Sequence, residues 1–142
     1  MPIRMLDYQS PEYDQMVALR YEVLRKPLGL QFSPDELARD ANDILIGAFD
    51  EEEILACCIL TNAGEKICRL RQMAVRNSLQ GKGIGANVLA FTETIAREKG
   101  FKSLYMHARK AAQGFYEKLG YQVCSDEFEE VSIPHVEMKK NL

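Results

Sequence analysis

The sequence predicts an α/β (α+β) domain built on a mixed sheet with helices on its faces. Short apolar runs rich in Ile, Leu and Ala are typical of strands, and they alternate with segments whose apolar residues recur every three or four positions, as in amphipathic helices. The predicted order is strands, helix, strand, helix, strands, which favours a sheet covered by helices. No repeat, low-complexity segment or linker divides the chain, so we expect a single domain over residues 1–142.

The composition is that of a globular protein. The chain has 142 residues, of which 46% are hydrophobic and 27% charged. A chain of this length buries enough surface to form a core without disulfides or a metal ion. The net charge is −3, and Lys and Arg are interspersed with acidic residues, which argues against a general nucleic-acid binder.

Neither a membrane nor a metal ion is expected as a partner. The first residues, Met1–Asp7, lack the apolar run and the cleavage site of a signal peptide, and no segment approaches the roughly 18 apolar residues that span a bilayer. We therefore expect a cytoplasmic protein. The four cysteines show no C-x-x-C spacing and the two histidines are far apart, which disfavours structural zinc.

The N-terminal third is expected to form one strand and two helices. Met1–Leu6 is a candidate first strand. Ser10 is a suitable N-cap and Pro11 suits the first turn of a helix that ends at Lys26–Gly29. A second capping serine with an acid three residues later predicts a short helix at Ser33–Leu37.

A hairpin and a third strand follow. Asp43–Phe49 and Glu53–Thr61 are apolar runs that flank the acidic turn Asp50–Glu52, which predicts a hairpin with a solvated tip. Lys66–Val75 is the next predicted strand. Its alternation breaks near Met73, which indicates a β-bulge.

The C-terminal half is expected to alternate helices and strands. A long helix is predicted from Gly83 to Lys99, with one apolar stripe formed by Ile84, Val88, Phe91 and Ile95. Gly100 ends this helix. The remaining predicted elements are a strand at Ser103–Ala108, a short helix at Ala111–Leu119, and strands at Tyr121–Cys124 and His135–Lys140.

The segment Gln80–Gly85 carries the clearest functional signal. Its three glycines allow a sharp turn and close approach of a ligand, and the following helix start leaves backbone N–H groups unpaired. Together with Lys82 these groups favour a phosphate, although an ordinary tight turn is the alternative.

A dinucleotide site is a second interpretation of the same segment. Gly81-x-Gly83-x-x-Ala86 satisfies the pattern G-x-G-x-x-G/A, with Arg109 placed to meet a 2′-phosphate. The five residues Arg76–Gln80 separate the preceding strand from the first glycine, which argues against it. A P-loop is excluded because no G-x-x-x-x-G-K-[ST] occurs.

Three motifs in this order resemble the GNAT superfamily of acyl-CoA N-acyltransferases. Gln80–Gly85 matches its [RQ]-x-x-G-x-[GA] loop, Met73–Val75 is similar to its fourth strand, and Phe115–Tyr121 is similar to its F-Y-x-x-x-G-[FY] segment. The resemblance covers the chain from about residue 43 to the end, and Phe128–His135 is similar to the tail of the ElaA-like branch. It implies a largely antiparallel central sheet of about six to seven strands flanked by about four helices.

The resemblance also implies a reaction. Acetyl-CoA serves as co-substrate, and its acetyl group passes to the primary amine of a small molecule or a protein by direct attack in a ternary complex. Tyr116 matches a tyrosine near the thioester sulfur, where its phenol is a suitable proton donor to the leaving thiolate. The alternative for Tyr116 is a packing role on the inner face of a short helix.

The residues implied for acetyl-CoA lie in three places. Backbone groups at the predicted bulge pair with pantetheine and polarise the thioester carbonyl; these belong to Met73, Ala74 and Val75. The backbone amide groups of Gly81, Lys82, Gly83, Ile84 and Gly85 hold the diphosphate, and the side chains of Gln80 and Lys82 flank it. Ala112 and Phe115 pack on the pantetheine arm, or serve only in the core.

Two departures from the family pattern affect the predicted site. Arg109 stands where many members have asparagine, and it either reaches a CoA phosphate or is a solvated side chain. Arg69–Gln72 offers no acid where many members have one, so the general base is open among Glu129, His135, His107 and a water chain. His135 and Glu129 are also open to a purely structural or surface role.

Arg69 and Arg71 lie two residues apart, so they are expected on one face of their strand. There they are either solvated or placed to bind a carboxylate or phosphate of the acceptor. Two other functions stay open at this point: a non-catalytic acyl-CoA-binding or sensing module, and a dinucleotide-dependent oxidoreductase. The final strands also leave an edge through which a homodimer can form.

Overall fold

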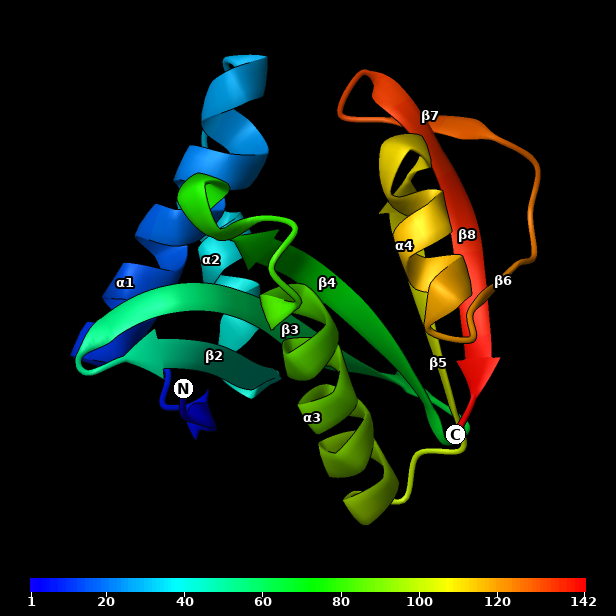
Figure 1. Ribbon diagram of the computed structural model, residues 1–142, viewed down its shortest axis with the longest axis horizontal. Helices are drawn as coiled ribbons and strands as arrows, with labels where there is room; N and C mark the ends of the chain where they lie inside the picture. Colours follow the sequence, from blue (N-terminus) through cyan, green and yellow to red (C-terminus); the bar gives the residue numbers. More distant parts are fainter.

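The computed structural model describes residues 1–142 and contains one eight-stranded sheet (Figure 1). The strands are β1 (Ile3–Leu6), β2 (Ile44–Asp50), β3 (Glu53–Gly64), β4 (Ile67–Val75), β5 (Ser103–Arg109), β6 (Gln122–Val123), β7 (Phe128–Glu130) and β8 (Ile133–Asn141). Their order is β1-β2-β3-β4-β5-β8-β6, with β7 paired to β8. Only β4 and β5 pair in parallel. The mixed, largely antiparallel sheet is therefore confirmed, and β7 is the strand that the sequence analysis did not assign.

Four α-helices flank the sheet: α1 (Pro11–Arg20), α2 (Pro34–Ala38), α3 (Ile84–Glu98) and α4 (Gln113–Lys118). The predicted caps are confirmed. The Ser10 hydroxyl accepts a hydrogen bond from the Tyr13 backbone, and Ser33 and Glu36 form a reciprocal capping box. A wider helical turn at Tyr21–Arg25 extends α1 toward the open end of the sheet.

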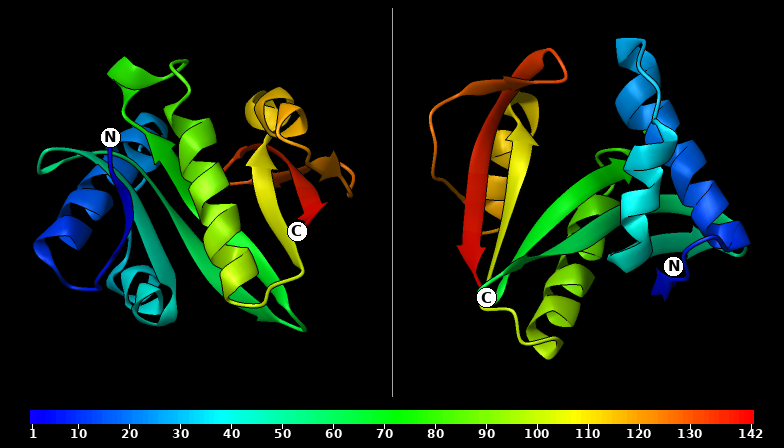
Figure 2. Two further views of the ribbon diagram at one scale, coloured as in Figure 1. Left: turned by 60° about the horizontal axis from the view of Figure 1, so that its bottom comes forward. Right: turned by 180° about the vertical axis from the view of Figure 1, so that it is seen from behind.

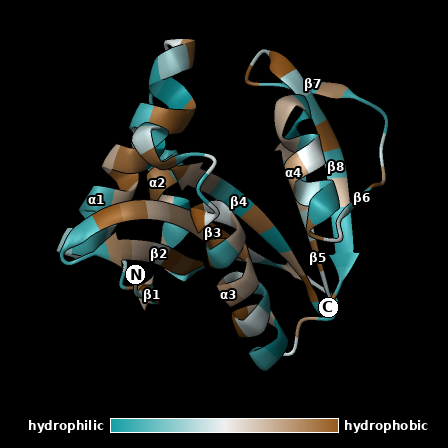
Figure 3. Ribbon diagram, viewed as in Figure 1, coloured by the Kyte–Doolittle hydropathy of each residue, from teal (hydrophilic) through white to brown (hydrophobic).

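The helices divide between the two faces of the sheet (Figure 2). Alternate residues of β2 show this division, because Ile46 packs in the core shared with α3 and α4, whereas Leu45 packs in the core shared with α1. Coloured by hydropathy, the strands show the brown of apolar residues over much of their length (Figure 3). None of the helices combines the length and the apolar character that a membrane-spanning segment requires.

The predicted bulge in β4 is confirmed. One residue of β3, Cys58, lies opposite two residues of β4, Gln72 and Met73, and Gln72 has a positive φ of 56°. The extra residue reverses the alternation of the strand. As a result Leu70, before the bulge, and Val75, after it, both face α3 and α4.

The strands β4 and β5 diverge beyond their paired section. Their pairing ends at Leu70 and Met106, although β4 continues to Val75 and β5 to Arg109. The two strands spread apart toward one end of the sheet (Figure 1). This divergence opens the space in which the candidate site lies.

Candidate active site

A cleft of about 430 Å³ lies between the diverging halves of β4 and β5. Its walls come from the helical turn Tyr21–Arg25 that follows α1, from α2, β4, β5 and α4, and from the β7–β8 hairpin. Residues distant in the sequence therefore meet here. Among the predicted site residues, those that line the cleft are Arg69, Arg71, Met73, His107, Arg109, Ala112, Tyr116 and His135.

The glycine-bearing loop that precedes α3 presents a row of free donors. Gly81 and Gly83 have φ values of 81° and 83°, which glycine adopts without strain. The backbone N–H groups of residues 81–86 donate to no acceptor in the protein. Because a Cβ on Gly81 or Gly83 would meet nothing within 4 Å, the space beside the loop is open. These donors at the start of a helix suit the diphosphate of a nucleotide cofactor.

Two side chains of this loop differ in their surroundings. Gln80 donates from Nε2 to the Val75 carbonyl and to the Asn77 side chain, both at 3.1 Å, so it braces the turn between β4 and α3. Lys82 is exposed and has no carboxylate within ion-pair distance, which leaves its ammonium available to an anionic ligand.

An apolar wall connects the loop with the cleft. A Cβ on Gly85 would lie 3.3 Å from Phe115 Cζ, 3.5 Å from Val75 Cγ2 and 3.7 Å from Met73 Cε. Phe115 is 39% exposed, which is unusual for so large an apolar side chain. The structure thus brings together residues that the resemblance assigned to pantetheine. Ala74 lies between them in the chain, but its side chain packs on the opposite face, with α1.

Tyr116 lies at the inner end of this wall. Its ring is 7% exposed and packs edge-on against Phe115 and Tyr121, with ring centroids 5.0 and 5.9 Å away. The hydroxyl makes no hydrogen bond within the protein, and the residue lines the cleft. Burial, assisted by the nearby Cys58 thiol, raises the pKa of Tyr116, so its phenol stays protonated at neutral pH.

A second group of titratable side chains lines the cleft across from the glycine loop. Glu130 lies between two histidines: its Oε1 is 2.9 Å from His107 Nδ1 and its Oε2 is 3.7 Å from His135 Nε2. The other ring nitrogen of His107 is 3.4 Å from a carboxylate oxygen of Glu137. This arrangement can accept and pass on a proton.

The candidates for the general base differ in their burial and in whether they line the cleft. His135 is only 3% exposed, and its Nδ1 lies 2.9 Å from the Ile133 carbonyl, so one ring nitrogen is held by the backbone. Glu129 is exposed and does not line the cleft. Its neighbour Glu130 does, because adjacent residues of a strand point to opposite sides. Sequence reasoning missed Glu130 because it did not predict the strand β7. The alternation of side chains along this strand decides which of the two acids faces the cleft.

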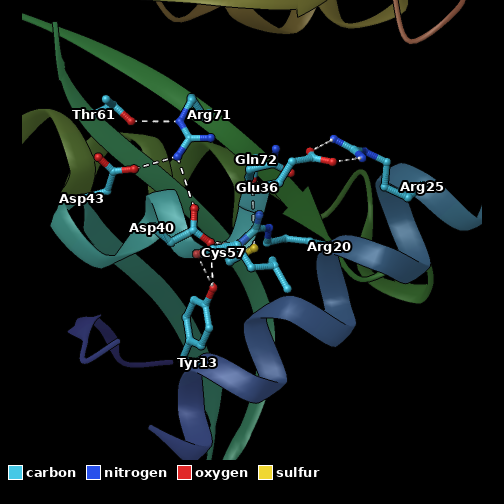
Figure 4. A network of polar contacts seen from close by, with 11 residues as sticks. Tyr13, Arg20, Arg25, Glu36, Asp40, Asp43, Cys57, Thr61, Arg71 and Gln72 are labelled. Atoms are coloured by element: carbon cyan, nitrogen blue, oxygen red, sulfur yellow. Dashed lines mark hydrogen bonds and ion pairs between the residues drawn. The ribbon is translucent and has the colours of Figure 1, made fainter. Parts of the chain in front are cut away.

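Arg69 and Arg71 lie on one face of β4, opposite α3 and α4, as expected. Arg71 is held by two neighbours: its Nε donates to Thr61 at 2.9 Å and its Nη2 to Asp43 at 2.6 Å (Figure 4). Arg69 has no carboxylate partner and approaches His107 Nδ1 at 3.1 Å.

Asp40 anchors Arg71 from below the cleft (Figure 4). This carboxylate is fully buried and accepts hydrogen bonds from Tyr13 at 2.7 Å, Arg20 at 2.8 Å and Arg71 at 3.3 Å. Asp40 thereby joins three elements: α1, β4 and the turn Arg39–Asn42, which we call the turn after α2. The network fixes the floor of the cleft beside the unpaired Arg69.

Arg109 lies on the same open face, at the end of β5. Its Nη2 donates to the Leu24 carbonyl at 2.9 Å, which ties β5 to the end of the α1 segment. Burial, together with the nearby charge of Arg25, lowers the pKa of Arg109. Arg25 itself is paired with Glu36 at 2.8 Å, and this hydrogen bond lowers the pKa of the Glu36 carboxyl.

Known proteins resemble this chain in sequence and in fold. The family model described as Acetyltransferase (GNAT) domain matches residues 17–142. The uncharacterised Bacillus subtilis protein YyaT is 39% identical over 74 residues, which are 52% of this chain and 50% of YyaT. The uncharacterised B. subtilis N-acetyltransferase YjcF is 32% identical over 74 residues, which are 51% of this chain and 53% of YjcF. The chain spans about half the length of these curated relatives.

Solved structures share the whole fold. An aminoglycoside 6′-N-acetyltransferase complexed with coenzyme A has a TM-score of 0.84 at 19% identity, covering 99% of this chain and 97% of that one. Escherichia coli ElaA has a TM-score of 0.83 at 20% identity, covering 99% of both chains. At these identities the likeness concerns the arrangement of the strands and helices.

Proposed function

The chain belongs to the GNAT family of acetyltransferases, and from this premise we propose that it transfers an acetyl group from acetyl-CoA to the primary amine of a small molecule or a protein. The reaction proceeds by direct attack with both substrates bound in a single domain over residues 1–142. The observation that supports this most is the continuous path from the free N–H groups of residues 81–86, along Phe115, to Tyr116 in the cleft.

The proposal gives each part of this path a task. The N–H groups beside Gly81 and Gly83 bind the diphosphate, with Lys82 adding a positive charge. The bulge at Met73 turns backbone groups of β4 toward the space between the strands, where a single N–H aimed at the developing oxyanion contributes about 3 kcal/mol. Tyr116 protonates the leaving thiolate.

Replacing Gly83 by alanine tests the binding of acetyl-CoA. The added Cβ meets no protein atom within 4 Å, so it occupies the space that the proposal assigns to the diphosphate. The methyl group is expected to displace the diphosphate from at least one N–H group, and the loss of that charge-assisted hydrogen bond weakens acetyl-CoA binding by about 10- to 100-fold. Isothermal titration calorimetry with acetyl-CoA measures this change.

Gly100→Ala is the matched control for that variant. Gly100 also has a positive φ, 87°, and its Cβ would also meet open space, but it lies at the far end of α3. Both variants therefore carry a similar backbone strain of about 1–2 kcal/mol. Equal acetyl-CoA affinities of the two variants would show that the loop does not hold the diphosphate.

For the proton of the amine, the proposal favours the pair His107 and Glu130. A primary amine has a pKa of about 10 and must lose a proton before it attacks at neutral pH. His107 lines the cleft and is hydrogen-bonded to Glu130 at 2.9 Å, so the pair offers an acceptor and a second group to stabilise the charge. This replaces the earlier candidate Glu129, which points away from the cleft.

Glu130→Gln is expected to lower kcat by about 10- to 100-fold at pH 7 and by much less near pH 10, where the amine is already deprotonated. Initial rates of CoA thiol release between pH 6 and pH 10 measure this profile. Glu129→Gln decides between the neighbouring acids. A pH-dependent loss in Glu129→Gln, with Glu130→Gln unaffected, would reverse the assignment.

The acyl-CoA sensing module is the remaining alternative and shares the same binding loop. It predicts acetyl-CoA binding without amine-dependent release of CoA thiol, so a panel of amines separates it from the enzyme. The dinucleotide oxidoreductase loses its support, because a sheet with only one parallel pair cannot hold two βαβ halves.

A further inference from the structure

The open face of β4, β5 and β8 is rich in positively charged side chains. Leu70, Met106 and Val136 of these strands point into the core with α3 and α4. Their neighbours Arg69, Arg71, His107, Arg109 and His135 therefore point to the opposite side and line the cleft. Seen from behind, no helix lies over β5 and β8 on this side (Figure 2).

Some of the cleft arginines are neutralised by carboxylates. Arg71 is paired with Asp43 and Asp40, and Arg25 with Glu36 (Figure 4). Three others that line the cleft have no carboxylate within 4.0 Å; these are Arg39, Arg69 and Arg109. Glu130 is the one acid of the cleft lining that pairs with no arginine.

These unmatched charges do not reflect a shortage of acids. The chain has 21 Asp and Glu against 18 Lys and Arg, yet none of the acids lies within ion-pair distance of these three guanidinium groups. Arg69 and Arg109 are half-buried, whereas Arg39 is exposed. Leaving the two half-buried positive charges without a counter-charge has an energetic cost, which a bound anion reduces. Arg69 also lacks one hydrogen bond, because its Nε is buried and has no hydrogen-bond partner.

We infer that the cleft binds an anionic group of the acceptor, a carboxylate or a phosphate, through Arg69, Arg109 and Arg39. The inference rests on the proposed function, because it names the substrate class of the same site. The planar guanidinium pairs with both groups in a bidentate manner. The same charges disfavour a polycationic amine, which would be repelled at short range.

The phosphates of acetyl-CoA are assigned elsewhere. The glycine loop leads into α3, which covers one face of the sheet (Figure 2), whereas Arg69 and Arg109 lie on the other face. Arg39 lies in the turn after α2, on the α1 side. The two sets of anion-binding groups therefore approach the space between β4 and β5 from opposite faces, one for each substrate.

Pairs of amines that differ only in charge test the inference. The pairs are β-alanine with β-alaninamide, and phosphoethanolamine with ethanolamine; spermidine serves as the polycation. Rates of CoA thiol release are expected to give at least a tenfold higher kcat/KM for the better anionic member than for its neutral partner. A preference for β-alanine over β-alaninamide identifies a carboxylate site, and a preference for phosphoethanolamine over ethanolamine identifies a phosphate site.

Arg69→Gln is expected to remove most of this preference by raising the KM for the anionic amine, with the affinity for acetyl-CoA unchanged. Arg97→Gln is the matched control, because Arg97 lies on α3 and pairs only with Glu93. Binding of inorganic phosphate, measured by calorimetry in the presence of saturating CoA so that the glycine loop is occupied, provides a readout without catalysis. It is expected in the wild type and lost in Arg69→Gln.

The outcomes separate this inference from the proposed function. Phosphate binding that depends on Arg69, without thiol release from any amine, would support the anion site and contradict the acetyltransferase activity. Thiol release with equal kcat/KM for charged and neutral amines, unaffected by Arg69→Gln, would overturn the anion site and support the activity. Absence of both would overturn both.

Discussion

Tyr116→Phe is expected to lower kcat by about 100- to 10,000-fold, the range in which a positioned general acid contributes. The variant removes one oxygen atom that forms no hydrogen bond within the protein, so the fold is expected to persist. Burial raises the pKa of Tyr116, and the phenol therefore stays protonated over the whole neutral range. Steady-state thiol release, together with the affinity for acetyl-CoA, measures the effect on each step.

Tyr121→Phe is the matched control. The Tyr121 ring packs against Tyr116, but its hydroxyl donates to Glu93 at 2.8 Å on α3 and does not line the cleft. This variant is expected to lose stability and to keep its kcat. If Tyr116→Phe retained the wild-type kcat from pH 6 to pH 10, the thiolate would take its proton from another group.

Asp40→Asn is expected to lower the free energy of unfolding by about 3–5 kcal/mol, because it removes one partner of a buried charge network. Arg20 is 1% exposed, and Asp40 is the one carboxylate with which it pairs. The substitution leaves this guanidinium buried without a counter-charge and weakens the support of Arg71. Urea unfolding followed by circular dichroism measures the change.

Glu22→Gln is a control for the same experiment. Glu22 pairs with Lys26 on the surface, where both side chains are more than half exposed, and such pairs contribute less than about 1 kcal/mol. A loss in Asp40→Asn as small as that in Glu22→Gln would show that the network does not hold the floor of the cleft.

Local chemistry explains which elements could be predicted from the sequence. The cap at Ser10 and the capping box at Ser33 depend on residues only three positions apart, and the structure contains both. The bulge near Met73 and the turn at Gly81 and Gly83 also have local signals, a broken alternation and repeated glycines.

The β7–β8 hairpin lacked such a signal. Its turn residues, Val131 and Ser132, have positive φ values of 46° and 67°, a conformation in which Asn and Gly are expected. Without them the strand β7 could not be recognised, and the acid at position 129 was preferred to Glu130. Here the pairing with β8 decides the conformation.

Long-range contacts were equally invisible in the sequence. Asp40 and Arg71 are 31 residues apart, and only the packing of α1 and the turn after α2 against β4 brings them together. The divergence of β4 and β5 is a property of the assembled sheet, because neither strand ends where the pairing ends. Sequence reasoning therefore placed Arg69 and Arg71 on one face but could not tell the free arginine from the paired one.

The crystal structure of the protein with coenzyme A tests the central claim most directly. The account predicts diphosphate oxygens within hydrogen-bond distance of the backbone N–H groups of residues 81–86, and the thiol between β4 and β5 near Tyr116. Coenzyme A bound away from the glycine loop, with the cleft beside Tyr116 closed to its thiol, would contradict it.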